Sequence, residues 1–311
     1  MVARVIAPIP ALGSAADAVN DGFGSAHGGW LAAAVGLHLA GQVFRGLGWR
    51  AVLGTSWPRV APARACAWYV CGAGLSGVLS ARGSDAVRVA LAKRALPEAS
   101  WPALAGTLAA EGSFEALCSI ALTLVALALG VGTAHLPSPL VVAAVAGLLG
   151  AAALVASRRP RARRLAFEIG RGAAVLRRPR RWLRCVVPWQ VAARVVRLGS
   201  AACFLLAVGL PVTPAIVLAA YAAQGSGGLL PLGFGPAAVG GALLVAVPLA
   251  AGHPLDRAAV SALAVVQPLA LTAVGLTTSV ALFAALSGAR TPAAVVRAAR
   301  ALRPRPAPAT P

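Results

Sequence analysis

Two acidic residues, Glu111 and Glu115, lie inside an otherwise apolar part of the chain. The stretch from Pro102 to Ala156 contains no other Asp, Glu, Lys or Arg. In a helix, a spacing of four residues places both carboxylates on one face, one turn apart. A carboxylate in an apolar surrounding is costly unless it is paired or protonated. We therefore expect both to face the interior of a helix bundle, either as an ion pair or protonated carboxyl that locks helices together, or as the contact for a cation, a proton or a lipid headgroup.

Two groups of arginines have the chemistry to meet these carboxylates or an anion. Arg82, Asp85 and Arg88 lie close together, and the spacing of three between Asp85 and Arg88 allows an ion pair on one helical face. Arg82 and Arg88 also suit a phosphate, because a guanidinium offers fork-like donors to its oxygens. Arg194 and Arg197 lie two to three turns inside an apolar stretch, as candidate partners of the glutamates or of a lipid phosphate. An exposed cytoplasmic loop is the alternative for residues 82–88.

Gly233 and Gly235 precede the apolar stretch that starts at Ala237, and they could act through their backbone. Glycines permit close approach, and the start of a helix presents unpaired N–H groups that favour an anion. A plain turn is the alternative. The cysteines and histidines are scattered without metal-ligand spacing, and there is no phosphate-binding or dinucleotide fingerprint. We therefore predict no catalytic residue, no metal site and no cofactor.

The elements that must position these residues are membrane helices. From Leu198 to Leu286 the chain contains one acid, Asp256, and one permanent base, Arg257. A water-soluble helical domain needs a polar face on each helix, so a stretch of this composition predicts a bilayer environment. Hydrophobic residues make up 59% and charged residues 12% of the chain, which is far from a soluble domain. We predict an all-α, polytopic integral membrane protein of about six to eight segments.

The apolar segments and basic loops divide the chain into five parts. They are an N-terminal surface segment (1–28), a first membrane half (29–157), a basic cytoplasmic connector (158–184), a second membrane half (185–288) and a basic, proline-rich cytoplasmic tail (289–311). The expected segments are 29–47, 64–79, 102–129, 136–156, 186–210, 214–230, 237–251 and 258–286. The connector contains eleven Arg. Because basic loops stay in the cytoplasm, the connector and the C-terminus are expected there.

The segment 64–79 conflicts with this orientation if it crosses the membrane fully. The loops 50–64 and 82–98 are both basic, so both favour the cytoplasm. The segment is interrupted by Gly72, Gly74, Ser76 and Gly77, so we expect it to enter and return on the same side. A second glycine-broken element, 224–236, holds the same place in the second half. This order predicts inverted repeats, an arrangement that marks a midplane binding site in transporters. Ordinary glycine-rich turns between hairpins are the alternative.

The motifs resemble those of a known membrane family. Residues 79–88, LSARGSDAVR, resemble the element LP-x-R-x-GD-x-x-R of the lysylphosphatidylglycerol synthase transmembrane-region family, a flippase-like group. Residues 229–235, LLPLGFG, look like its element LP-x-x-PGG-x-G-x-x-E. Glu111 and Glu115 fall where that family has ER-x-x-D, and Trp49 with Arg50 fits its first basic loop. The resemblance covers about residues 28–288. The chain departs from the pattern at Ser80, Gly112, Glu115, Ala237 and Ala238.

The resemblance implies a protein that moves or handles phospholipids or polyprenyl-linked lipids. No soluble aminoacyl-transfer domain follows the membrane halves, so we do not expect synthase activity. The resulting hypothesis is a multi-pass protein of a bacterial inner (plasma) membrane that binds and translocates an anionic lipid, with phospholipids and anionic headgroups as partners. We expect no nucleic-acid binding, and self-association is left open. The alternatives are a membrane-embedded transferase acting on lipid-linked substrates and a non-catalytic membrane scaffold.

Overall fold

The described part of the chain is entirely helical, as the sequence predicts. The structure is a computed structural model, and it describes residues 24, 26–77, 81–128, 160–226, 235–251 and 255–288. Its α-helices are α2 (Gly28–Ser56), α3 (Pro62–Gly74), α4 (Ala81–Ala95), α5 (Trp101–Ala128), α7 (Pro160–Gly172), α8 (Pro179–Cys185), α9 (Val187–Ala207), α10 (Pro214–Ser226), α11 (Gly235–Ala251) and α12 (Arg257–Ser287). Two 3₁₀ turns, η2 (Leu75–Gly77) and η3 (Ala174–Arg177), accompany them.

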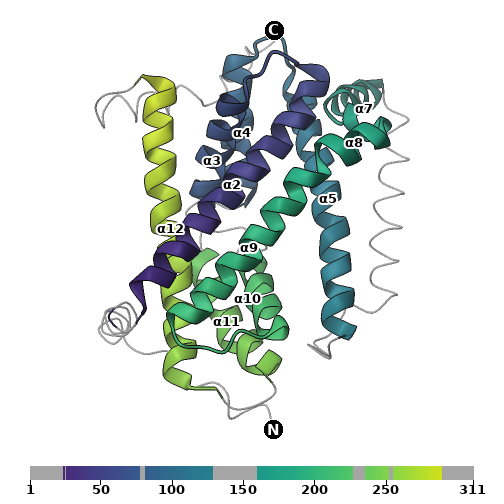
Figure 1. The fold of residues 1–311 in the computed structure, drawn as a ribbon. Coiled ribbons are helices and arrows are strands. Elements are labelled where there is room, and N and C mark those ends of the chain that lie inside the picture. Colours follow the sequence, from purple (N-terminus) through teal and green to yellow (C-terminus); the bar gives the residue numbers. More distant parts are fainter. Residues whose placement is uncertain are drawn as a thin grey trace.

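The same order of long and short helices occurs twice along the chain. In residues 28–128 a long helix is followed by two short ones and another long one, namely α2, α3, α4 and α5. In residues 187–287 the same order recurs as α9, α10, α11 and α12 (Figure 1). The expected segment 136–156 lies outside the described residues.

The long helices α2 and α9 run antiparallel along the middle of the molecule (Figure 1). The backbone N–H of His27, at the start of α2, donates to the carbonyl of Ala207, at the end of α9, over 2.8 Å. Further along, the Ser200 hydroxyl donates to the carbonyl of Ala34 over 2.7 Å. Gly41 and Gly48 continue the same face of α2 at intervals of seven residues and face α9. Small side chains at these positions let the two helices approach closely.

The short helices form two hairpins that enter from opposite ends of the molecule (Figure 1). The hairpin α3–η2–α4 begins and ends at one end, where Trp57 and Val60 before α3 join Ala99 after α4 in one apolar cluster. The hairpin α10–α11 begins and ends at the other end, where Leu210 before α10 and Leu255 before α12 share a second cluster. The chain thus returns to the end at which α3 begins, but the return is made by α4, which the sequence analysis assigned to a basic loop, and not within residues 64–79 as predicted.

Gly72 lies inside helix α3, and Gly74 is its last residue. Helix α3 continues through Gly74 and only then tightens into η2. A side chain at Gly74 would overlap the backbone of Gly275 and the hydroxyl of Ser279 in α12. A side chain at Gly72 would come within 2.7 Å of the Ser84 carbonyl in α4. Gly72 therefore allows α3 to lie close to α4, and Gly74 allows it to lie close to α12.

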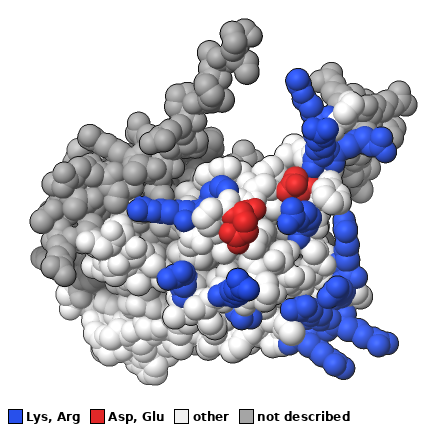
Figure 2. Space-filling model, turned by 90° about the horizontal axis from the view of Figure 1, so that it is seen from above, with Lys and Arg blue, Asp and Glu red and all other residues white. Residues whose placement is uncertain are grey.

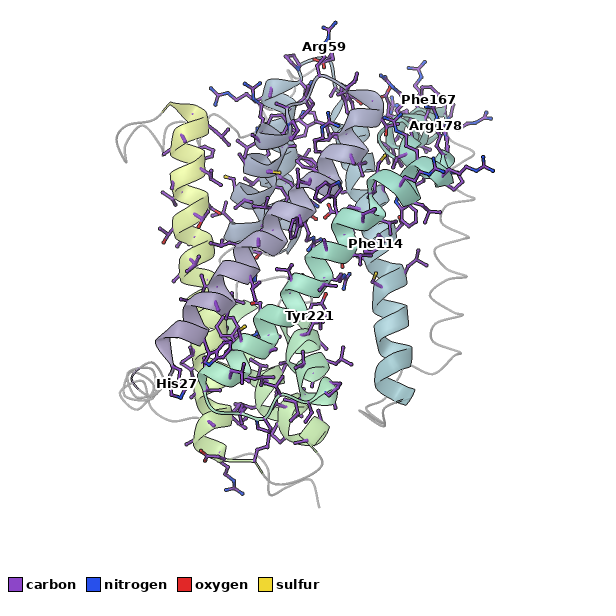
Figure 3. The ribbon with its side chains drawn as sticks, viewed as in Figure 1. His27, Arg59, Phe114, Phe167, Arg178 and Tyr221 are labelled. Atoms are coloured by element: carbon purple, nitrogen blue, oxygen red, sulfur yellow. The ribbon has the colours of Figure 1, made fainter. Side chains whose placement is uncertain are left out.

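The described part of the arginine-rich connector, residues 160–184, is largely helical. Helix α7 packs against α5, where a side chain at Gly172 would overlap the carbonyl of Ala103. Its outer surface exposes Leu165 and Phe167 beside exposed arginines. Figure 3 places Arg59, Phe167 and Arg178 at one end of the molecule and His27 at the opposite end. Figure 2 shows this end, on which Lys and Arg side chains far outnumber Asp and Glu.

Two of the described helical stretches are long and apolar enough to cross a bilayer, namely 179–207 and 257–287. Their most apolar windows have a mean hydropathy of 1.4 and 2.0. The helices α2 and α5, with 29 and 28 residues, have the length of a span but contain charged residues that meet inside the molecule. The all-α prediction is confirmed for the described residues, and the number of six to eight crossings stays a prediction.

Candidate functional site

The carboxylate of Glu111 lies at the centre of a buried ion-pair network. The side chain is only 2% exposed. Its Oε1 accepts from Arg45 Nη2 at 3.0 Å and from the hydroxyl of Tyr69 at 3.1 Å. Its Oε2 accepts from Arg88 Nη1 at 2.7 Å. The donors come from α2, α3 and α4, so one carboxylate on α5 ties three other helices together.

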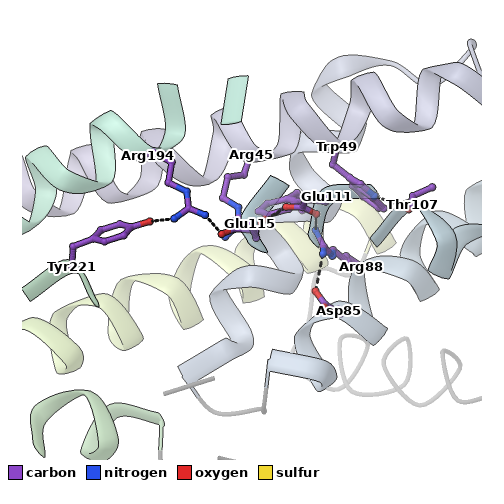
Figure 4. Close-up of polar contacts among 10 residues, drawn as sticks. Arg45, Trp49, Asp85, Arg88, Thr107, Glu111, Glu115, Arg194 and Tyr221 are labelled. Carbon is purple, nitrogen blue, oxygen red and sulfur yellow. Dashed lines mark hydrogen bonds and ion pairs between the residues drawn. The ribbon is translucent and has the colours of Figure 1, made fainter. Parts of the chain in front are cut away.

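The network extends in both directions from Glu111 (Figure 4). On one side, Arg88 Nη2 lies 2.8 Å from Asp85 Oδ1 on the same helix, which is the pair that their spacing allows. On the other side, Arg45 Nη2 also lies 2.7 Å from Glu115 Oε1. The second oxygen of Glu115 pairs with Arg194 of α9. Arg194 Nη1 in turn donates to the hydroxyl of Tyr221 in α10 over 2.6 Å. A continuous polar path thus joins both halves.

Aromatic rings cover the guanidinium groups of this network. The Arg88 guanidinium carbon lies 4.8 Å from the centre of the Tyr69 ring and 5.4 Å from that of Trp49. Trp49 is fully buried, and its indole N–H donates to the Thr107 hydroxyl over 2.9 Å. Cation–π contacts of this kind contribute more when water is excluded. The rings therefore help to hold Arg88 in place without using up its hydrogen-bond donors.

A cavity of about 420 Å³ lies beside the network and reaches toward the second half. Its volume falls in the range of small-molecule sites. Beside the ion pairs it has an apolar lining from both halves, with Leu39, Val70 and Leu108 from the first half and Val239, Pro268 and Leu271 from α11 and α12. The charged side chains that line it are Arg45, Asp85, Arg88, Glu111, Glu115 and Arg197. The ionic groups, of which Arg88 and Glu111 are buried, thus line a hollow inside the protein.

Arg197 differs from the other arginines of the cavity. Among the ion pairs of the described residues, it has no carboxylate partner, whereas Arg45, Arg88 and Arg194 each have at least one. Its Nη2 lies 3.4 Å from the amide oxygen of Gln224, and its guanidinium carbon lies 5.4 Å from the centre of the Tyr221 ring. Its Nε is buried without a hydrogen-bond partner.

The structure brings together five of the eight residues that the sequence singles out. Asp85, Arg88, Glu111, Glu115 and Arg194 belong to one network. The segment that holds the first two is helix α4, so the alternative of an exposed loop is wrong for Arg88, which is 6% exposed. The remaining three are not placed in the network. Arg82 lies in α4, and the structure describes its backbone but not its side chain. Gly235 is the first residue of α11, and Gly233 lies outside the described residues.

Sequence reasoning missed Arg45, Tyr69, Tyr221, His38 and Gln224 as site residues. The predicted segment 29–47 places Arg45 near its end, but α2 continues to Ser56, and Arg45 therefore lies well inside the helix. The apolar character of residues 51–54 is a signal that could have extended the predicted helix. The tyrosines and Gln224 give no spacing signal, because their role depends on which helices become neighbours.

Comparisons of the chain with protein-family models, with curated proteins and with solved structures find no match. In the described residues, no group of three or more His, Cys, Asp or Glu side chains is arranged to hold a metal ion. The arrangement is therefore assessed from its own chemistry. It combines a rigid set of charged groups, one guanidinium without a carboxylate and an adjoining cavity with an apolar wall.

Proposed function

We propose that the chain is a polytopic membrane protein that binds an anionic lipid in the cavity and moves it across the bilayer. The observation that carries the proposal is a cavity lined by residues of both halves, which combines partly or fully buried arginines with apolar side chains such as Leu39, Val70 and Leu271. Such a combination suits an amphipathic ligand, because a headgroup needs donors and acyl chains need apolar surface. The motifs that resemble the flippase-like family favour the same function.

The membrane placement is supported by the apolar helices and by the charge distribution. Exposed arginines gather at the end of the molecule that holds Arg59 and Arg178 (Figure 3). Beside them, Leu165 and Phe167 of α7 are exposed, 49% and 64%, a combination that suits a helix lying at the headgroup level. By the positive-inside rule, this end faces the cytoplasm of a bacterial inner membrane. The opposite end then holds the turn between α9 and α10.

The two hairpins support a transport function over a purely structural one. They enter from opposite ends, and residues of both, such as Tyr69 of α3 and Gln224 of α10, line the same cavity. Opposed half-length helices that meet at a central site are the arrangement found in many secondary transporters. In this interpretation the two halves are inverted repeats. Movement of one hairpin against the long helices would open the cavity to one side of the membrane, and movement of the other hairpin would open it to the opposite side.

Glu111 has a structural role in this proposal. Its carboxylate accepts three hydrogen bonds from three helices, so both oxygens already hold protein side chains in place. Glu115 is 29% exposed and connects Arg45 to Arg194 across the two halves. The acidic residues thus hold the arginines in position, and the arginines present the positive charge to the cavity.

The test is lipid translocation by the purified chain in vesicles that contain fluorescent phosphatidylglycerol. Thr272 of α12 lines the cavity outside the charged network, so Thr272→Trp fills the cavity without removing an ion pair. Thr277, on the same helix, is exposed and does not line the cavity, so Thr277→Trp is the matched control. We expect translocation by the native chain and by Thr277→Trp, and loss toward the level of empty vesicles in Thr272→Trp. If both variants translocate the lipid at the rate of the native chain, the lipid does not pass through this cavity.

A further inference from the structure

Buried polar atoms without partners are concentrated around the cavity. In the described residues, ten buried side-chain N or O atoms lack a hydrogen-bond partner, and six of them belong to residues that line this cavity. The six atoms are His38 Nδ1, Gln42 Oε1, Arg45 Nε, Arg88 Nε, Arg197 Nε and Gln224 Nε2. Native proteins leave few buried polar groups unpaired, so such a concentration indicates a ligand or water.

Most of these atoms are hydrogen-bond donors. The Nε atoms of Arg45, Arg88 and Arg197 and the amide nitrogen of Gln224 only donate. His38 Nε2 lies 3.2 Å from Gln42 Nε2. Because the amide N–H donates in that contact, we assign the proton of the neutral ring to Nδ1, which makes His38 a further donor. A surplus of donors matches a ligand that offers several acceptor oxygens, as a phosphate does.

The charge of the site sets the charge of this ligand. Four guanidiniums (Arg45, Arg88, Arg194 and Arg197) meet three carboxylates (Asp85, Glu111 and Glu115) among the described side chains of the cavity and its network. One positive charge is left over, and it belongs to Arg197, the arginine without a carboxylate. Water can satisfy donors, but it does not neutralise this charge. A ligand with one negative charge does.

The position of Arg197 is fixed by its surroundings. Its side chain crosses α2 at Gly41, where an added Cβ would come within 3.0 Å of Arg197 Cγ. Gln224 accepts from its Nη2, and Tyr221 lies beside the guanidinium. The guanidinium is therefore held against the α9–α10 wall, with His38 and Gln42 of α2 lining the same cavity.

From these observations we infer that Arg197, His38 and Gln224 form a subsite for a monoanionic phosphodiester, the headgroup linkage of a phospholipid such as phosphatidylglycerol. The inference rests on the proposed function for the lipid nature of the ligand. It assigns phosphate recognition to Arg197 in place of Arg88 and Arg194, whose guanidiniums pair with carboxylates. It disfavours polyprenyl diphosphates, whose several negative charges exceed the single positive charge found among the described side chains.

The test is calorimetric titration of the full chain, purified in a non-ionic detergent, with three soluble probes. The probes are dihexanoyl-phosphatidylglycerol, inorganic phosphate and geranyl diphosphate. We expect the phosphodiester lipid to bind most tightly. Tighter binding of geranyl diphosphate would contradict the charge argument, and binding of inorganic phosphate as tight as that of the lipid would show a site for free phosphate and overturn the assignment.

Three variants test the residues of the subsite. Arg197→Gln removes the unpaired charge, and we expect affinity for the short-chain lipid to fall about tenfold to hundredfold. Arg197→Lys keeps the charge but loses the guanidinium fork, so its affinity should lie between that of the native chain and that of Arg197→Gln. Gln224→Glu keeps Arg197 and supplies it with a carboxylate, so it should suppress anion binding by a similar factor while preserving the fold. Arg59→Gln, at an exposed position away from the cavity, is the control.

The two proposals fail in distinguishable ways. If the native chain neither binds phosphatidylglycerol nor moves it in vesicles, the proposed function is wrong. If the native chain does both, while Arg197→Gln and Gln224→Glu match it in affinity and translocation, the lipid function stands and the subsite is wrong. Because Gln224→Glu adds an ion pair, a loss of binding in this variant with an unchanged unfolding temperature would not be explained by a folding defect.

Discussion

At the scale of single residues, Glu111 is a buried carboxylate that connects three other helices through its hydrogen bonds. An isolated carboxylate in an apolar bundle would be strongly destabilising, but this one accepts hydrogen bonds from two arginines and a tyrosine. The same contacts align the guanidiniums of Arg45 and Arg88 beside the cavity. We therefore expect the removal of Glu111 to affect the stability of the fold before it affects recognition of a ligand.

Glu111→Gln should destabilise the fold by about 3–5 kcal/mol, because it leaves two buried guanidiniums without their shared counter-ion. Glu98→Gln is the control, since Glu98 is exposed in the turn before α5, and it should change stability by less than about 0.5 kcal/mol. Thermal unfolding of the purified chain in detergent measures both. A Glu111→Gln variant as stable as Glu98→Gln would mean that the network is not formed in the protein.

At the scale of the elements, close helix contacts depend on glycines that have no room for a side chain. Gly74 in α3 and Gly275 in α12 face each other, with the Gly74 carbonyl 3.0 Å from a Cβ built at Gly275. This contact holds the first hairpin against α12 and forms part of the cavity wall. The sequence shows the glycines but not what they approach, because the partner lies two hundred residues away along the chain.

Gly74→Ala should lower the stability of the chain by about 1–3 kcal/mol, because the added methyl overlaps backbone atoms that cannot rotate away. Gly36→Ala is the matched control in α2, where nothing lies within 4 Å of the added atom. The measurement is the unfolding temperature of both variants. If Gly74→Ala is no less stable than Gly36→Ala, then α3 and α12 are not in close contact.

At the scale of the whole molecule, the charge distribution predicts an orientation in the membrane. The segments before α3 and after α4 lie at the same, arginine-rich end, whereas the turn between α9 and α10 lies at the opposite end (Figure 1). We expect single cysteines at Arg59 and Glu98, in a chain otherwise without cysteine, to react with a membrane-impermeant reagent from the cytoplasmic side. A cysteine at the exposed Val212 should react only from the outside. Labelling of 59 and 98 from opposite sides would exclude the same-side hairpin.

The sequence predicts the class of fold and the charged core of the site, since apolar length and isolated charges are local signals. Glu111, Glu115, Arg88 and Arg194 stand out because each interrupts or borders an apolar run. The pairing between them is not local. Arg45 pairs with Glu111 across two helices, and Glu115 pairs with Arg45 and Arg194 but not with the neighbouring Arg197. Which arginine pairs with a given carboxylate depends on how the helices pack against each other.

The most direct measurement of the central claim is the translocation rate of two fluorescent lipids in vesicles that contain the native chain. Phosphatidylglycerol carries one net negative charge. Phosphatidylcholine, with the same acyl chains, has the same phosphodiester, but its choline cation makes the net charge zero, so it would leave the surplus positive charge of the cavity unbalanced. The structure predicts that the chain moves phosphatidylglycerol well above the rate in empty vesicles and phosphatidylcholine much more slowly. Translocation of phosphatidylglycerol at the rate of empty vesicles, or equal rates for both lipids, would contradict an anion-selective lipid site in this cavity.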